Sequence, residues 1–231
     1  MAYPIEGNAD LVQPEVISAY LRAMFGHVEF ENDDLVVFRG IGERGSPSEG
    51  LKPVNHAVQP ALVPLDEVAI ALARRWAQYN YAAYVVPGVT KDPHARADSI
   101  RLMTAVMVDL DNGDTVAKFY HAQERMPFPP DFVVESGGFT MGGLPKLHLY
   151  WMLKEPSEDI ARCMRMRDKL ARMLGGDVAL GIAEHGAAIG RAHQPIRIPG
   201  TVYAKGNSDS TPASRIVKVT IDREGRFHMV H

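Results

Sequence analysis

The sequence lacks several features that mark familiar protein classes. It has one cysteine, Cys163, in 231 residues, which excludes an internal disulfide framework and a four-cysteine zinc site. No apolar run approaches the roughly 20 residues that a membrane span needs. The N-terminal segment MAYPIEGNADL has no basic region ahead of an apolar stretch, so it is unlike a signal peptide. We therefore expect a globular, cytoplasmic protein with no membrane contact.

An excess of positive charge is also missing. Lys and Arg number 25 against 28 Asp and Glu, which gives a formal net charge of −3. Any contact with nucleic acid must therefore come from a local basic patch rather than from the whole surface. Hydrophobic residues make up 46% of the chain, and its length suits one large domain or two lobes that share a core.

Helices and strands alternate irregularly along the sequence. Apolar residues at helical spacing predict helices over 14–25, 66–80, 115–125 and 157–174. Asp66 and Asp114 are the expected N-caps, and Gly175 the expected stop of the last helix. Apolar runs predict strands over 35–38, 81–86, 103–110, 132–135 and 147–152, then a final hairpin over 215–231. Polar or Gly- and Pro-rich segments predict loops over 40–53 and 87–98. This order favours an α+β fold over a regular parallel α/β fold.

Two acids close the strand predicted over 103–110. In the run Val-Met-Val-Asp-Leu-Asp, Asp109 and Asp111 fall on one face, and Val108 and Leu110 on the other, because side chains alternate along a strand. Neighbouring carboxylates repel each other unless a cation neutralises them. Such hard oxygen ligands suit Mg²⁺ or Mn²⁺, especially when phosphate oxygens complete the coordination shell. An ordinary polar strand end is the alternative, and the pattern alone does not decide between them.

A histidine interrupts the apolar strand predicted over 147–152. Leu147 and Leu149 share one face of this strand, which leaves His148 and Tyr150 on the other. Taken alone, a histidine in a strand is most often structural. If this strand and the strand of the two aspartates share a sheet, all three side chains project into one cleft. His148 could then donate a hydrogen bond to a phosphate, as imidazole or imidazolium.

The glycine-rich segment 135–143, ESGGFTMGG, is not a phosphate-binding fingerprint. It lacks the Lys-Ser/Thr of a P-loop and a following helix, so we expect a hairpin connection there.

Further cations follow toward the C-terminus. A step of about 100° per residue gathers a basic stripe on the helix predicted over 157–174, formed by Arg162, Arg165, Lys169 and Arg172. This stripe could follow a nucleic-acid backbone or simply face solvent. Asp177 follows two glycines, which permit a close approach to a site. Arg191, Arg197 and Lys205 then surround a rigid Ile-Pro-Gly turn, and such cations suit a triphosphate.

The order of these motifs resembles the archaeo-eukaryotic primase superfamily, above all the primase-polymerases of plasmids and phages with RepB-type primase domains. The resemblance is carried by Asp-Leu-Asp at 109–111, Glu-Ser-Gly leading to His148-Leu-Tyr-Trp, Gly-Gly-Asp177, and Arg197-Ile-Pro-Gly-Thr. It covers roughly residues 79–205. It implies an N-terminal α/β unit over about 1–105 packed on an RRM-like unit over about 106–231. The active site would lie in the cleft between the two units.

The resemblance also implies residue roles. Asp109, Asp111 and Asp177 match the catalytic acids that hold Mg²⁺ or Mn²⁺, and His148 matches the histidine that contacts the nucleotide's phosphates. Lys146, Arg191, Arg197 and Lys205 are the further candidates for nucleotide binding. The partners implied are single-stranded DNA, nucleoside triphosphates and a replicative helicase, the last either separate or part of a longer chain. Two positions depart from the family pattern, since Lys146 stands where a small residue is usual and Tyr203 where an Asn is frequent.

Three other functions compete with a primase-polymerase. A glycosyltransferase also uses Asp-x-Asp to hold a metal, but it leaves His148 and the Arg-Ile-Pro-Gly segment without a role. A rolling-circle nickase needs paired His-x-His ligands, and leucines flank His148 on both sides. An RRM-like single-strand binder without catalysis would stack bases on exposed aromatics of its sheet, for which Tyr150 is the one obvious candidate.

Overall fold

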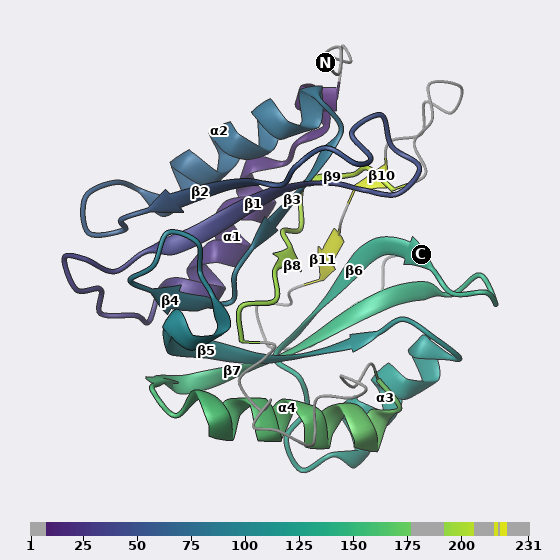
Figure 1. Cartoon of the computed structure of the whole chain (residues 1–231). Coiled ribbons are helices and arrows are strands. Elements are labelled where there is room, and N and C mark those ends of the chain that lie inside the picture. The colour runs from purple at the N-terminus through teal and green to yellow at the C-terminus, as the bar shows by residue number, and fades with distance from the viewer. Residues whose placement is uncertain (1–7, 177–191, 206–214, 217, 221–231) are drawn as a thin grey trace.

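Two main β-sheets lie one above the other in the computed structural model, which describes residues 8–176, 192–205, 215–216 and 218–220 (Figure 1). The first sheet has the order β2 (Val54–Val58), β1 (Val36–Gly42), β3 (Tyr81–Val85) and β8 (Ile196–Arg197). The second has the order β11 (Lys218–Thr220), β6 (Phe132–Phe139), β7 (Pro145–Ser157), β5 (Ile100–Leu110) and β4 (Gly88–Thr90). Two short strands, β9 (Val202–Tyr203) and β10 (Arg215–Ile216), pair with each other.

Four α-helices accompany the sheets in the described part of the chain. Helices α1 (Pro14–Phe25) and α2 (Leu65–Gln78) pack with the first sheet. Helices α3 (Thr115–Arg125) and α4 (Ile160–Leu174) lie along the outer side of the second (Figure 1). Short 3₁₀ turns precede α1 (η1, Asn8–Leu11) and β5 (η2, Ala97–Ser99). The expected α+β class is therefore confirmed. No helix among the described residues is long and apolar enough to cross a membrane.

Strands β5, β6 and β7 form the centre of the second sheet. Because β7 lies between the other two and is antiparallel to both, β5 and β6 run parallel, and α3 makes the connection between them. This is the split βαβ arrangement. After α4, the chain returns to the first sheet as β8, so that sheet contains strands from both ends of the sequence. The division into units near residue 105 stays a prediction.

The pleat of β5 and β7 separates apolar from polar side chains, as the sequence predicts. Val108 and Leu110 of β5 and Leu147 and Leu149 of β7 are almost fully buried in a core shared with α3 and α4. The alternating residues of both strands face the opposite way. The core formed with α3 and α4 therefore fixes which side chains the second sheet presents to the first.

A buried aromatic contact joins α1 to this inner face of the second sheet. The Tyr20 ring meets Tyr150 and Phe132 edge to face, with 6.0 Å between ring centroids in each case, and the two tyrosine hydroxyl oxygens lie 3.4 Å apart. Both tyrosines are completely buried. Burial raises the pKa of each, so both hydroxyls stay protonated in the physiological range.

Most helix boundaries follow the sequence signals. Helices α1 and α3 have their predicted bounds, and the Asp114 carboxylate caps α3 by accepting a hydrogen bond of 2.9 Å from the Ala117 backbone N–H. Gly175 ends α4 in the left-handed conformation, with φ of 60°. The prediction of Asp66 as an N-cap is wrong, because α2 begins at Leu65 after Pro64. Asp66 lies in the first turn, where its charge still favours the helix dipole.

The strands are predicted less completely than the helices. β4 lies inside the loop predicted over 87–98, β2 has no predicted counterpart, and β1 extends into the loop predicted over 40–53. β6 continues through the glycine segment to Phe139, with an irregular register against β7 after Glu135. Within the final segment, β10 pairs with β9 and β11 pairs with β6, and residues 221–231 lie outside the described residues.

The apolar core between the second sheet and helices α3 and α4 should contribute most to the stability of the protein. Leu149 has no exposed surface, so Leu149→Ala should leave a cavity and reduce the free energy of unfolding by about 2–5 kcal/mol in urea titrations. Leu62, which is 70% exposed, provides the matched control, and Leu62→Ala should change stability by less than about 0.5 kcal/mol. Equal effects of the two substitutions would contradict this assignment of the core.

Candidate active site

A polar cleft of about 230 Å³ lies between the two sheets. The first sheet and the segments on either side of β8 contribute Tyr84, Gln194, Arg197, Tyr203 and Lys205. The second sheet and the end of β5 contribute Asp109, Asp111, Lys146 and His148. The cleft thus brings together six of the residues expected to act in catalysis or nucleotide binding. Asp177 and Arg191, also expected there, lie outside the described residues.

The acids and bases of β5 and β7 face each other because of the strand register. Asp109 and His148 are direct partners across the two antiparallel strands, with 3.6 Å between Asp109 Oδ1 and His148 Nε2. Asp111 lies two residues after Asp109, and Lys146 two residues before His148, so they form a second pair beside the first. The distance from Lys146 Nζ to Asp111 Oδ2 is also 3.6 Å. Two carboxylates therefore face one histidine and one lysine of β7 in the cleft.

His148 is held as a neutral imidazole in this site. Its burial lowers the pKa below the ordinary value, and the positive charges of Arg197 and Arg167 act in the same direction, while Asp109 opposes them. Only 8% of the residue is exposed, and its Nδ1 atom has no hydrogen-bond partner among the described residues. A neutral imidazole can still donate one hydrogen bond, and the unpartnered nitrogen points to a ligand that completes the site.

The carboxylates of Asp109 and Asp111 suit a divalent cation. Both are partly exposed in the cleft, and hard carboxylate oxygens are the ligands that Mg²⁺ and Mn²⁺ prefer. Gly176 lies against this end of β5, since a Cβ atom added to it would come within 2.9 Å of the Asp109 carbonyl oxygen. The next residue in the sequence is Asp177, the expected third acid.

Another group of acids lies elsewhere. Glu31, Asp33 and Asp34 form the one group of three possible metal-ligating side chains within 4.8 Å of one another in the part of the chain that the structure describes. Lys91 binds the first two, with Nζ to oxygen distances of 2.8 and 2.9 Å, and these contacts raise its pKa to about 12. Arg101 Nε lies 2.9 Å from Asp34 Oδ1. Lys91 and Arg101 thus place two positive charges among these three carboxylates.

The two acidic groups are far apart. Arg101 and Asp109 are eight residues apart on the same strand, which is about 26 Å at the usual rise. The group around Glu31 therefore cannot share metal ions with the cleft.

The Arg197 side chain has a partner that the sequence does not reveal. Its guanidinium forms a double ion pair with Glu43, in which Arg197 Nη1 lies 2.9 Å from Glu43 Oε2 and Nη2 contacts Oε1. Glu43 lies in the segment predicted as a loop and is 154 positions away in sequence. No local pattern could have linked the two residues, because their contact depends on how β1 and β8 pair with β3.

Arg167 is a buried cation that no sequence prediction named. It is 5% exposed on α4, and its Nη2 atom lies 3.1 Å from Gln194 Oε1, in the segment that lines the cleft. One signal was available, because Arg167 falls on the apolar face of its helix together with Cys163, Met164 and Ala171. A charged residue in such a position requires a polar partner.

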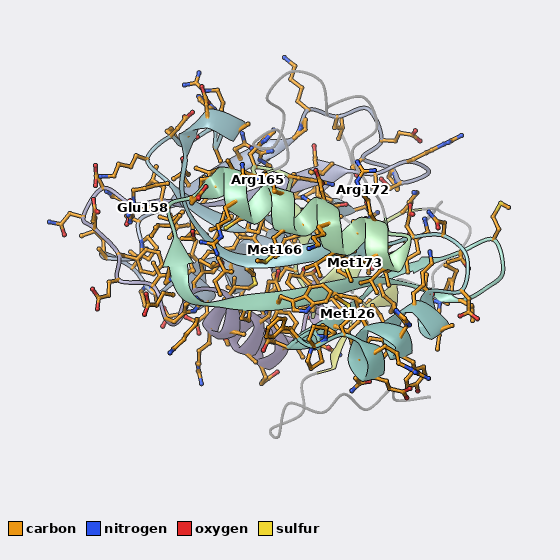
Figure 2. The ribbon with its side chains drawn as sticks, turned by 90° about the horizontal axis from the view of Figure 1, so that it is seen from below. Met126, Glu158, Arg165, Met166, Arg172 and Met173 are labelled. Carbon is orange, nitrogen blue, oxygen red and sulfur yellow. The ribbon has the colours of Figure 1, made fainter. Side chains whose placement is uncertain are left out.

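The predicted basic stripe is exposed but lies outside the cleft. Arg162, Arg165, Lys169 and Arg172 are all solvent-accessible on α4, which covers the side of the second sheet away from the first. Figure 2 shows this helix from below, with Met166 next to Arg165 and Met173 next to Arg172. The cleft and the stripe thus occupy opposite sides of the second sheet.

Tyr150 does not provide a stacking platform for bases. It is completely buried between Tyr20 and Phe132, with its ring stacked on Phe132 at 4.4 Å between centroids. The aromatic residue on which a non-catalytic RRM-like binder would depend is therefore inaccessible to nucleic acid.

The comparisons with known proteins identify the fold. No protein-family model matches the sequence, and no curated protein matches it either. Among solved structures, the chain is similar to the archaeo-eukaryotic primase domain of the primase-polymerase of cyanophage S-2L, with a TM-score of 0.59 and 14% sequence identity over 94% of each chain. The resemblance to archaeo-eukaryotic primases is thereby confirmed at the level of the fold: the chain adopts the fold of a phage primase-polymerase domain.

Proposed function

We propose that this protein is a template-directed nucleotidyltransferase, a primase-polymerase that makes or extends primers on single-stranded DNA in plasmid or phage replication. The observation that carries this proposal is the placement of Asp109 and Asp111 beside His148 and Lys146 in a polar cleft of a primase-polymerase fold. In this account β1, β2 and β3 belong to the N-terminal α/β unit and the split βαβ to the RRM-like unit, with the active site between them.

The acids would hold the metal ions. Asp109, Asp111 and Asp177 are the proposed ligands of two divalent cations, Mg²⁺ or Mn²⁺. When bound, such ions activate a 3′-hydroxyl and stabilise the pyrophosphate leaving group. The chain's own contribution is to hold the two carboxylates of β5 on one face at a fixed spacing, with their charges partly balanced by Lys146.

The cations and the imidazole would bind the triphosphate. His148 can donate one hydrogen bond to a phosphate oxygen without adding charge, because a neutral imidazole carries one N–H. Lys146 and Lys205 supply point charges within the cleft, and Arg197 presents a planar guanidinium at its wall. Arg191 is proposed to act with them. A replicative helicase remains the expected partner.

Nucleotide incorporation on a single-stranded DNA template tests the proposal directly. With Mg²⁺ or Mn²⁺, the wild type should produce template-dependent products, and Asp109→Ala/Asp111→Ala should reduce their rate at least about 100-fold, because the metal ions lose their ligands. The control Glu31→Ala/Asp33→Ala removes two acids outside the cleft and should retain activity. A folded wild type that incorporates no nucleotide, with or without a primer, would refute the proposal.

Metal binding should follow the same residues. In Mn²⁺ titrations followed by calorimetry, Asp109→Asn/Asp111→Asn should weaken binding at least about 10-fold, since amides replace both anionic ligands. Glu31→Gln/Asp33→Asn should bind Mn²⁺ as the wild type does, because Lys91 and Arg101 already engage the carboxylates of that group. The reverse result would transfer the metal site to the acids near Glu31.

We further propose that the basic stripe of α4 contacts the DNA backbone. Each phosphate contact on single strands contributes about 0.7 to the slope of log affinity against log salt concentration. Arg165→Gln/Arg172→Gln should therefore reduce the magnitude of this slope by about 1.4. The control Arg74→Gln/Arg75→Gln removes two exposed arginines from α2 and should leave the slope unchanged. Equal slopes for all three proteins would show that α4 faces solvent only.

A further inference from the structure

Arg197 occupies an enclosed position in the wall of the cleft. It is 8% exposed, and its guanidinium carbon lies 5.0 Å from the ring centre of Tyr84 and 4.7 Å from that of Tyr203. The two rings hold the side chain between them and favour its positive charge. Arg197 cannot turn away from the cleft without leaving both aromatic contacts.

Glu43 supports Arg197 from the side away from the cleft. Arg197, Tyr84 and Tyr203 all line the cleft, whereas Glu43 does not. The Glu43 carboxylate accepts hydrogen bonds from both terminal nitrogens of Arg197, and a third of 2.6 Å from the Tyr84 hydroxyl. A guanidinium has five N–H donors. Glu43 accepts from two of them, and its negative charge cancels the positive charge of Arg197.

The charges of the side chains that line the cleft determine whether it attracts a polyanion before metal ions bind. Apart from the imidazole of His148, the cleft wall carries two carboxylates, Asp109 and Asp111, and the cations Lys146, Lys205 and Arg197. With Arg197 balanced by Glu43, the two lysines only offset the two carboxylates, so the side chains that line the described cleft have no net charge to attract a polyanion. Arg167 lies behind this lining and is buried on α4. Two divalent cations would add four positive charges, which equals the charge of a fully ionised nucleoside triphosphate.

We propose that Glu43 makes triphosphate binding depend on divalent metal, by cancelling the charge of Arg197 in the metal-free cleft. Glu43 is then a positioning residue: it acts through Arg197, keeps the guanidinium in place and prevents the empty site from taking up metal-free polyphosphate. The triphosphate enters only with or after the metal ions. This inference rests on the proposed nucleotidyltransferase function and specifies the order of binding in the same site.

Inorganic tripolyphosphate is the probe that tests this, because it has the three linked phosphates of the nucleotide without base or sugar. Calorimetry in EDTA should show weak binding to the wild type. Glu43→Gln, which is nearly isosteric but neutral, should bind tripolyphosphate at least 10-fold more tightly in EDTA. The gain should disappear in Glu43→Gln/Arg197→Gln, and Glu43→Asp, which keeps the charge, should resemble the wild type. A purely structural role for Glu43 would weaken binding rather than strengthen it.

No gain by a folded Glu43→Gln protein in EDTA would overturn the inference. Circular dichroism and thermal unfolding establish folding, because this variant leaves a buried guanidinium without its counter-charge. The wild type provides a test that needs no variant: its affinity for tripolyphosphate should rise at least 10-fold when Mg²⁺ replaces EDTA, and equal affinities would contradict the inference. Failure of the proposed function is a different result, namely a wild type that incorporates no nucleotide.

Discussion

The candidate site depends on the register of β5 against β7. Asp109 lies opposite His148 because the two strands pair at that position, and Asp111 and Lys146 follow from the two-residue period of the pleat. A slip of one residue in either strand would turn its polar side chains into the layer covered by α3 and α4. The buried leucines of that layer therefore fix the register, so the same alternation that builds the core also directs the acids and the histidine into the cleft.

The same geometry also arranges the charged side chains of the cleft. Asp109 lies beside the neutral imidazole of His148, Asp111 lies beside Lys146, and Arg197 has its own counter-charge in Glu43. With Lys205 also in the lining, the charges of the empty cleft offset one another, which limits the cost of holding them in a partly buried site. The cleft therefore becomes positively charged only when metal ions bind. In this account, metal ions organise the substrate site as well as the chemistry.

The sequence predicted the parts of this structure that depend on neighbours along the chain. Alternation placed Asp109 and Asp111 on one face and His148 on another strand's polar face, and helical spacing located α1, α3 and α4. It missed the Glu43–Arg197 pair and the short strand β4, because these depend on pairings between distant segments rather than on local pattern. The prediction of Asp66 as an N-cap was wrong because an acid in the first turn of a helix and an acid at its N-cap give similar sequence signals. Arg167 could have been found, as a cation on an apolar helix face.

The central claim is that Asp109 and Asp111 hold the metal ions that bind the triphosphate. A crystal of the protein grown with Mn²⁺ and a non-hydrolysable deoxynucleoside triphosphate, measured at the manganese absorption edge, tests it most directly. The account predicts anomalous density between the two aspartates, with the triphosphate extending toward His148 and Lys146. Manganese among Glu31, Asp33 and Asp34, with the cleft occupied by neither metal nor nucleotide, would contradict it.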